Sequence, residues 1–294
     1  MQILKFILLA CFLSSCSLLS SQKPMPTVVQ EIKDATGANV RITIPSKKII
    51  SLSCGISEGL YVLEKGDDII AVTDDCSHLP QVKGKESVGS KENISIDKMI
   101  RLSPELVISM DGDVPDQTIT NLRDMGICVF VLKQCATQED VQENFRLLGI
   151  ITKTQGAAEL NIADANERID AVAKRVKNPG PKVFWEIGAK PLTTVGMGSY
   201  VDTIIRLAGG KNIVSGKTKF PYYTVPAVVK NNPDVIILSN VPKEESLRWK
   251  QIELINASQN NRIYSVDPWL LNASTPLAMA EAVEKISNLL YAVQ

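Results

Sequence analysis

The chain has 294 residues, and its 32 lysines and arginines equal its 32 aspartates and glutamates, so its formal net charge is zero. A neutral chain without a run of basic residues interleaved with aromatics is not expected to bind nucleic acid. His78 is the single histidine, which excludes a metal cage built from three histidines. It also leaves His78 as the sole candidate base for a His-dependent catalytic triad.

The first residues have the pattern of an export signal. Lys5 precedes the apolar run 6–13, which is too short to span a bilayer, and the run ends in Leu13-Ser14-Ser15-Cys16. A small-residue triplet directly before a cysteine resembles the bacterial lipobox, in which the cysteine is acylated and becomes the mature N-terminus. We therefore predict a lipoprotein signal peptide over 1–16 with the lipid on Cys16. An ordinary cleaved export signal is the alternative.

Residues 17–40 are predicted to be a tether and lead-in, because 17–26 are polar and contain proline. No later segment comes near the roughly 18 consecutive apolar residues that a membrane-spanning helix requires. The lipid is therefore the one membrane attachment that the sequence predicts. The protein is expected outside the cytoplasm, in the periplasm or at the cell surface.

Residues 41–151 are predicted to form an N-terminal α/β lobe. A strand is expected at 48–53, followed by a helix and the turn Lys65-Gly66-Asp67. Ser95 can cap a short helix, and the β-branched run 106–109 after Pro104-Glu105 is typical of a buried parallel strand. A further strand is expected at 128–132.

The segment 152–178 is predicted to connect two lobes as one long helix over 152–177. Its apolar residues recur at steps of four and three, which places them on one face of a helix: Ala158, Ile162, Ala165, Ile169, Val172 and Val176. Pro179-Gly180-Pro181 ends the helix. At about 1.5 Å per residue the helix would span roughly 39 Å, which suits a strut. A long surface helix in a single domain is the alternative.

Residues 179–294 repeat the pattern of the first lobe. A strand at 182–187 is followed by a helix and a glycine-rich turn, Thr224 can cap a short helix, and strands are expected at 235–238 and 262–266. Strands that alternate with helices predict doubly wound sheets. The expected fold is therefore α/β, with two doubly wound lobes of mainly parallel sheets joined by one long rigid α-helix. Ligands bind at the carboxyl ends of such strands, so facing lobes would form a cleft.

Four cysteines follow the signal, all in the first lobe, and export would place them where disulfides persist. Cys128 and Cys135 bracket one strand, about 23 Å apart if extended, so they should not pair. Cys54 and Cys76 follow neighbouring strands, and their bridge is the favoured pairing. Two free buried thiols are the alternative. A metal site made from Cys76 and His78 is a weaker one.

The sequence gives no support for an enzyme. It has no Gly-x-Gly-x-x-Gly after a strand, and Gly196-Met197-Gly198-Ser199-Tyr200 lacks the Lys-Ser/Thr of a phosphate-binding loop. We therefore predict a binding protein without a cofactor or a bound metal. The alternative of another class is a metal-dependent extracytoplasmic enzyme, which would need Cys76 and His78 to hold the metal.

Several motifs together resemble a known family over roughly residues 40 to 292. They occur in the order Lys48-Ile49-Ile50-Ser51-Leu52-Ser53, Leu102-Ser103-Pro104-Glu105-Leu106-Val107-Ile108, Thr194-Val195-Gly196-Met197-Gly198-Ser199, Leu207-Ala208-Gly209-Gly210-Lys211-Asn212-Ile213 and Asn232-Pro233-Asp234-Val235-Ile236-Ile237. The resemblance is to the substrate-binding proteins of ABC importers for cobalamin, ferric siderophores and haem. It implies a monomer with a shallow ligand cleft that closes only slightly, and a membrane permease as partner.

Within that family, the segments 71–80 and 183–187 look most like the cobalamin branch. The expected strand-end loops are rich in aromatics and poor in cations, which suits a flat corrin ring with amide-tipped side arms. Haem, through an axial Tyr200 or Tyr222, and a ferric siderophore remain alternatives, and each aromatic could instead pack in the core. The predicted ligand-binding residues are Ser53, Cys54, Cys76, His78, Asp111, Trp185, Tyr200, Phe220, Tyr222, Tyr223 and Trp269.

The resemblance also implies one carboxylate on each lobe that pairs with arginines of the permease. Asp97 stands at the first of these positions, although a residue in the first turn of a helix can be acidic simply because it stabilises the helix dipole. Pro226 stands at the second position and cannot make that contact. The expected function is therefore that of a lipid-anchored binding protein that delivers a cobalamin-like corrinoid to an ABC importer and docks through Asp97.

Overall fold

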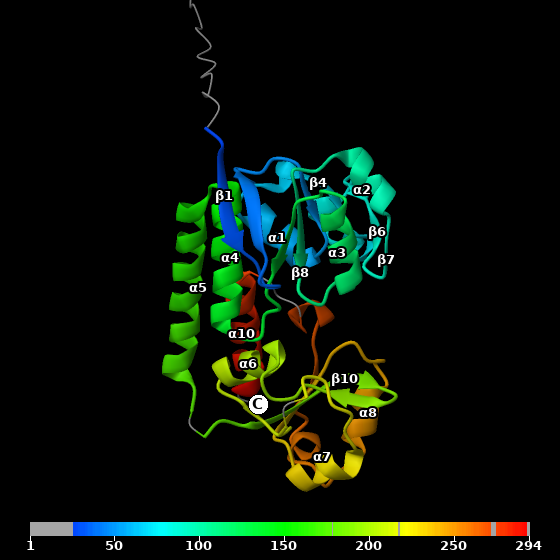
Figure 1. The fold of residues 1–294 in the computed structure, drawn as a ribbon. Helices are drawn as coiled ribbons and strands as arrows, with labels where there is room; N and C mark the ends of the chain where they lie inside the picture. Colours follow the sequence, from blue (N-terminus) through cyan, green and yellow to red (C-terminus); the bar gives the residue numbers. More distant parts are fainter. Residues whose placement is uncertain (1–25, 178, 217, 272–274, 293–294) are drawn as a thin grey trace, which may run out of the picture.

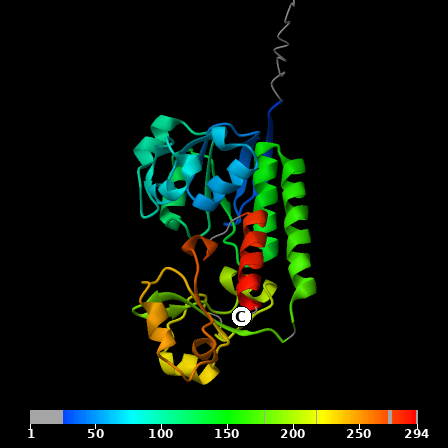
Figure 2. The same ribbon diagram turned by 180° about the vertical axis from the view of Figure 1, so that it is seen from behind.

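The computed structural model describes residues 26–292 apart from 178, 217 and 272–274. The predicted signal peptide and Cys16 lie outside these residues. Two α/β lobes stand one above the other, and a layer of long helices runs along one side of both (Figure 1). The view from behind shows the same layer (Figure 2). No helix among the described residues is both long enough and apolar enough to cross a membrane.

The first lobe is built on a five-stranded parallel sheet in the order β5-β4-β3-β8-β9. The chain enters at the central strand, moves to one edge and returns to the other, which is the doubly wound arrangement predicted. Its strands are β3 (Ile49–Ser51), β4 (Ile69–Val72), β5 (Glu86–Ser87), β8 (Leu106–Met110) and β9 (Val129–Leu132).

Helices cover both faces of this sheet because its strands alternate between two cores. Leu106 and Ile108 of β8 pack in the core formed with α1 and α4, whereas Val107 packs on the opposite face with α2 and α3. The helices are α1 (Cys54–Val62), α2 (Ile96–Leu102), α3 (Asp116–Asp124) and α4 (Gln138–Thr152). Short elements lie between β4 and α2, namely η2 (Asp74–His78), η3 (Pro80–Val82), β6 (Gly89–Ser90) and β7 (Asn93–Ile94), and η1 (Gly66–Asp68) precedes β4.

An antiparallel hairpin, β1 (Val28–Lys33) and β2 (Asn39–Ile44), precedes the sheet. The predicted lead-in 17–40 therefore contains ordered strand. The buried carboxylate of Asp34 fixes the hairpin turn by accepting hydrogen bonds from the backbone of Thr36 at 2.9 Å and Ala38 at 3.1 Å. The same carboxylate accepts from the backbone N–H of Val131 in β9 at 3.1 Å and pairs with Arg123 of α3. One side chain thus joins the turn, the edge strand and a helix.

The connecting helix is shorter than predicted. Thr152 is the last residue of α4, Lys153 has a left-handed backbone with φ of 59°, and α5 runs over Gln155–Arg175. The apolar period that predicted the helix begins only at Ala158, so it did not locate this turn. The 21 residues of α5 span about 32 Å. Gly149 of α4 permits close packing on α5, because a Cβ there would lie 2.8 Å from the Cβ of Ala158.

The apolar face of α5 belongs to both lobes. Ala158 and Ile162 pack in a core of the first lobe, whereas Ala165, Ile169 and Val172 pack in a core of the second. The final helix α10 (Pro276–Leu290) lies along α5, where Arg168 and Glu284 form two hydrogen bonds of 3.0 and 2.6 Å. The chain therefore crosses between lobes through α5, which α4 and α10 support (Figure 1).

The second lobe repeats the two-core design around the order β11-β10-β13-β14, with β12 paired to β10. All pairings are parallel except that of β10 with β11. Val235 and Ile237 of β13 face α6 and α10, and Ile236 and Leu238 face α7 and α8. The elements are β10 (Lys182–Ala189), β11 (Leu192–Thr194), α6 (Tyr200–Leu207), β12 (Lys211–Asn212), α7 (Val225–Asn231), β13 (Val235–Leu238), α8 (Glu245–Lys250), α9 (Asn256–Gln259), β14 (Ile263–Ser265) and η4 (Pro268–Leu271).

Candidate functional site

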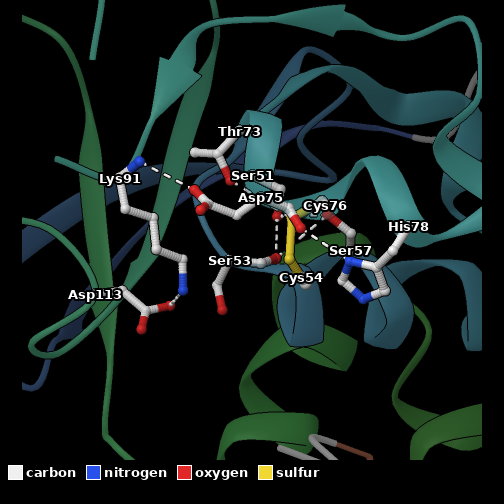
Figure 3. The surroundings of a disulfide bond; sticks show 10 residues. All are labelled: Ser51, Ser53, Cys54, Ser57, Thr73, Asp75, Cys76, His78, Lys91 and Asp113. Carbon is white, nitrogen blue, oxygen red and sulfur yellow. Dashed lines mark hydrogen bonds and ion pairs between the residues drawn. A yellow bond between two sulfur atoms is a disulfide. The ribbon is translucent and has the colours of Figure 1, made fainter. Parts of the chain in front are cut away.

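A disulfide joins the carboxyl ends of β3 and β4 in the first lobe. Cys54, the first residue of α1, is bonded to Cys76 of η2, with Cα atoms 5.0 Å apart (Figure 3). This confirms the favoured pairing, which followed from the expectation that neighbouring parallel strands end side by side. Cys128 and Cys135 are free thiols. Cys76 therefore has no thiolate to offer a metal, and the described residues contain no cluster of three or more potential metal ligands.

Buried hydroxyls support the strand end beside this disulfide. Ser57 donates to the Oγ of Ser51 at 2.9 Å, and Ser51 donates to the carbonyl of Ser53 at 2.9 Å. The side chain of Ser53 turns away from this chain of hydroxyls (Figure 3). Ser53 is itself only 5% exposed, so any ligand contact from it would be made by a small part of its surface.

Charged groups surround the same strand ends. The ammonium of Lys91 lies 3.0 Å from a carboxylate oxygen of Asp113, and the Lys91 backbone N–H donates to Asp75 at 3.0 Å (Figure 3). His78 is exposed, and its Nδ1 lies 2.9 Å from the carbonyl oxygen of Asp75. Asp111, directly after β8, is also exposed. The first lobe therefore presents a polar surface at the carboxyl ends of its strands.

Two of the predicted ligand-binding aromatics lie in the core of the second lobe. Trp185 is 0% exposed, and its indole N–H donates to Ser239 Oγ at 2.8 Å. Tyr200, the first residue of α6, is 9% exposed, and burial raises the pKa of its phenol. Its hydroxyl has no hydrogen-bond partner in the part of the chain that the structure describes. Both residues belong to the core cluster that also contains residues of α5, α6 and α10, and their predicted ligand contacts stay a prediction.

Two other predicted aromatics are exposed on one loop of the second lobe. Phe220 and Tyr222 are 56% and 76% exposed, and Met197, which follows Gly196, is 55% exposed. The loop is fixed by backbone hydrogen bonds, from Thr194 to the carbonyl of Pro221 and from Gly196 to that of Lys219. Glycine is required at 196, because a Cβ would lie 2.0 Å from the carbonyl oxygen of Thr218.

Tyr223 differs from its neighbour in the same loop. Its ring packs on Phe184, with ring centroids 5.9 Å apart, and its hydroxyl accepts a hydrogen bond from Asn231 at 3.1 Å. Tyr223 therefore anchors the loop and is half-buried. The side chain of Trp269, in η4, lies outside the described part of the structure, so its predicted role stays a prediction.

The aromatic loop lies beside the first lobe. Lys219 donates to the side-chain oxygen of Gln134 at 3.0 Å, and Thr203 of α6 donates to the carbonyl of Ala136 at 2.8 Å. Gln134 and Ala136 follow β9 of the first lobe. These contacts bring the exposed aromatics of one lobe near the strand ends of the other.

The sequence did not reveal a buried acid in the second lobe. Glu186 of β10 is 0% exposed, accepts a hydrogen bond from the indole of Trp249 at 2.5 Å, and lies 3.2 Å from the guanidinium of Arg248. Burial, the largest influence, raises the pKa of the carboxyl to about 7, and Glu245 adds to the rise. A lone carboxylate within the apolar stretch 183–187 was the signal that could have identified it.

The two positions implied for permease docking occupy matching elements. Asp97 is exposed in the first turn of α2, and Pro226 is exposed in the first turn of α7. Ser95 and Thr224 are the respective N-cap residues. The two lobes thus have equivalent helices at these positions, but only α2 has a carboxylate in its first turn.

Comparison with known proteins places these features in context. A family model described as "Periplasmic binding protein" matches residues 49–269. An uncharacterized ABC transporter substrate-binding lipoprotein, YvrC of Bacillus subtilis, is 27% identical over 88% of this chain and 85% of its own length. The vitamin B12-binding protein of Vibrio cholerae is 26% identical over 85% of this chain and 91% of its own length.

A solved structure shares the fold. It is described as a possible iron-binding (periplasmic solute-binding) protein from Staphylococcus epidermidis, and it superposes with a TM-score of 0.74 at 22% identity. The match covers 84% of this chain and 99% of the other. The two-lobed α/β architecture described above is therefore one that known binding proteins adopt.

Proposed function

The chain belongs to the periplasmic binding protein family, and from that premise we propose that it carries a cobalamin-like corrinoid to the permease of an ABC importer. Members of the family are extracytoplasmic solute-binding proteins of ABC importers rather than enzymes, and they bind their ligand without a resident cofactor. The proposal concerns the identity of the ligand, the lipid anchor and the docking residue.

The exposed pair Phe220 and Tyr222 is the observation that carries the ligand assignment. Their rings are more than half exposed, on a loop that the neighbouring Lys219 links to the first lobe. Two neighbouring exposed aromatic rings gain free energy when an apolar ligand covers them. A corrin ring offers a broad apolar face, and its amide arms could hydrogen-bond the polar strand ends of the first lobe. The vitamin B12-binding relative supports the same ligand.

Isothermal titration with cyanocobalamin, haem and a panel of ferric siderophores tests this assignment. We expect cyanocobalamin to bind most tightly. The double variant Phe220→Ala/Tyr222→Ala should weaken its binding by about 1–3 kcal/mol, or roughly 5- to 150-fold, because two ring contacts are lost. Leu254→Ala, which removes an equally exposed apolar side chain elsewhere, is the control. No heat with cyanocobalamin alongside micromolar siderophore or haem binding would reverse the ranking.

Haem or a ferric siderophore is the second candidate. The hydroxyl of Tyr222 is exposed on the same loop and could serve as an axial ligand to haem iron. The solved structure described as possibly iron-binding makes an iron-containing ligand worth testing. A Soret band in the purified protein that Tyr222→Phe abolishes would favour haem over a corrinoid.

The lipid anchor and the docking contact need tests in cells. We propose that Cys16 carries the lipid, so Cys16→Ala should move the protein from the membrane fraction to the soluble fraction. A variant that remains in the membrane fraction would contradict this assignment.

We propose that Asp97 docks on the permease, so Asp97→Ala should lower uptake while leaving the affinity for ligand unchanged. Asp124→Ala, on another exposed first-lobe helix, is the control; equal uptake by both variants would remove Asp97 from the docking surface.

A further inference from the structure

A cavity of about 350 Å³ lies at the outer edge of the first-lobe sheet. It is bounded by the turn of the β1–β2 hairpin, the end of β8, the edge strand β9 and helix α3. The elements that enclose it are held together by the Asp34 carboxylate, which binds both the hairpin turn and Val131. The lining residues are Thr36, Met110, Asp111, Gly112, Val114, Asp116, Ile119, Thr120, Arg123 and Val131.

The floor of this cavity is apolar. Val114, Ile119 and Val131 are 3–6% exposed and belong to the core between the sheet and α3. Met110, which is half-buried, adds a flexible thioether. Such a floor gains free energy when a compact hydrocarbon group covers it.

The mouth of the cavity is acidic. Asp111 and Asp116 are both exposed, and neither carboxylate has a cationic partner among the described residues. The one basic residue in the lining, Arg123, is already engaged: its guanidinium pairs with Asp34 and donates to Thr36 Oγ1 and the carbonyl of Val129, each at 3.1 Å. Two negative charges therefore remain uncompensated over an apolar floor.

The polar groups inside the cavity are also committed to the protein. Thr120 donates its hydroxyl hydrogen to the carbonyl of Asp116 at 3.1 Å, and Thr36 donates to the Asp34 carboxylate at 2.7 Å. The two threonine hydroxyls of the lining thus donate to the protein itself. The cavity therefore combines a negatively charged mouth with an apolar floor.

We propose that this cavity binds a small organic cation, consisting of a primary ammonium group on a compact apolar body. The ammonium would lie between the carboxylates of Asp111 and Asp116, and the apolar body would cover Val114, Ile119 and Val131. The volume of about 350 Å³ is at the lower end of the range for small-molecule sites. In this proposal Asp111, which was predicted to contact the corrinoid, belongs to this cavity instead, whereas the exposed aromatics proposed to cover the corrin ring belong to the other lobe.

A series of three probes with one ring and different charge tests the proposal. Benzylammonium, benzyl alcohol and benzoate are titrated into the full protein while the amide signals of residues 110–123 are followed by nuclear magnetic resonance. Benzylammonium should bind in the millimolar range, as expected for a ligand of this size. Benzyl alcohol should bind at least tenfold more weakly, and benzoate should cause no shifts. Equal affinities for the three probes would overturn the proposal.

Substitutions then locate the ammonium. Asp111→Asn and Asp116→Asn should each weaken benzylammonium binding about 3- to 10-fold, and the double variant should abolish the preference over benzyl alcohol. Asp124→Asn lies on the same helix but outside the lining, and it should bind benzylammonium as the wild type does. Unchanged binding by the double variant would refute the assignment.

A competition experiment separates this site from the corrinoid site. Saturating benzylammonium should leave the affinity of the wild-type protein for cyanocobalamin unchanged within twofold. A tenfold loss would place both ligands in one site and overturn the proposal. If cyanocobalamin does not bind at all, the proposed function is wrong. The series of three probes still tests whether the cavity binds an organic cation.

Discussion

The two lobes share an architecture but differ in what they present at their strand ends. The first lobe has a disulfide, a chain of buried hydroxyls and the Lys91–Asp113 ion pair. The second lobe has Phe220 and Tyr222, exposed on a loop that backbone hydrogen bonds hold in place. The difference indicates that a shared fold fixes where the surfaces lie, whereas local residues decide whether each surface is polar or apolar.

A second contrast lies within the aromatics of the second lobe. Trp185 and Phe220 were predicted to have the same role, yet one is wholly buried and the other is more than half exposed. The strand position of Trp185 places it under α6 and α10, and the loop position of Phe220 keeps it outside. Substitutions at these positions should separate stability from binding.

The largest effect is expected from Trp185→Ala. Removing a fully buried indole leaves a large cavity and should cost about 3–5 kcal/mol of unfolding free energy. Phe220→Ala should cost less than about 0.5 kcal/mol, because the ring is mostly exposed. Urea denaturation measures both values. Similar losses for the two variants would contradict the contrast between core and surface.

The acid in the second lobe should make stability depend on pH. Glu186 has its pKa raised to about 7 in the folded protein, so between the unfolded value and 7 the folded state binds more protons. Stability should therefore fall as pH rises through this interval, by up to about 3 kcal/mol.

Glu186→Gln should remove this pH dependence, because the amide oxygen can still accept from Trp249. Thermal melts at pH 5 and pH 8 compare the two proteins, with Glu105→Gln, an exposed acid in the first lobe, as the control. Wild type and Glu186→Gln should differ in stability by more at pH 8 than at pH 5. An equal difference at both values would show that ionisation of Glu186 is not responsible.

The disulfide should stabilise the first lobe by a comparable amount. It closes a loop with a sequence separation of 22, for which chain entropy predicts about 3 kcal/mol. The double variant Cys54→Ser/Cys76→Ser should lose about 2–4 kcal/mol in urea denaturation. Cys128→Ser, which removes a free thiol, should show little of this loss. A double variant as stable as the wild type would make the bond dispensable.

The smallest effect concerns the contact between lobes. Thr203→Val removes the hydrogen bond to the carbonyl of Ala136 and should cost about 1 kcal/mol. Thr120→Val, which removes a hydroxyl bonded within its own helix, is the matched control. Ligand affinity should change in the first variant alone if the contact sets the relation of the lobes. A change of the same size in both would exclude that role.

Local patterns sufficed for much of the fold. The β-branched run 235–238 and the strands around it were predictable because parallel strands covered on both faces are continuously apolar. The Cys54–Cys76 bridge followed from the order of two neighbouring strands. Phe220 and Tyr222 were expected in a strand-end loop, and both lie in the loop between β12 and α7.

Features that depend on distant residues were not predictable. The left-handed turn at Lys153 lies before Ala158, where the apolar period of α5 begins, so the start of α5 was predicted three residues early. The burial of Trp185 depends on α10, which lies far along the chain. Asp34 reaches Val131 across 97 positions, and no short pattern around Asp34 indicates such a partner.

The single apolar face of α5 has a consequence for the protein as a whole. The apolar residues of its first half pack in the core of the first lobe, and those of its second half pack in the core of the second lobe. Dividing the chain at this helix would leave apolar core residues exposed to water in each fragment, so neither fragment should fold well alone. The two lobes should accordingly melt together as one cooperative unit, despite the separate sheets that distinguish them.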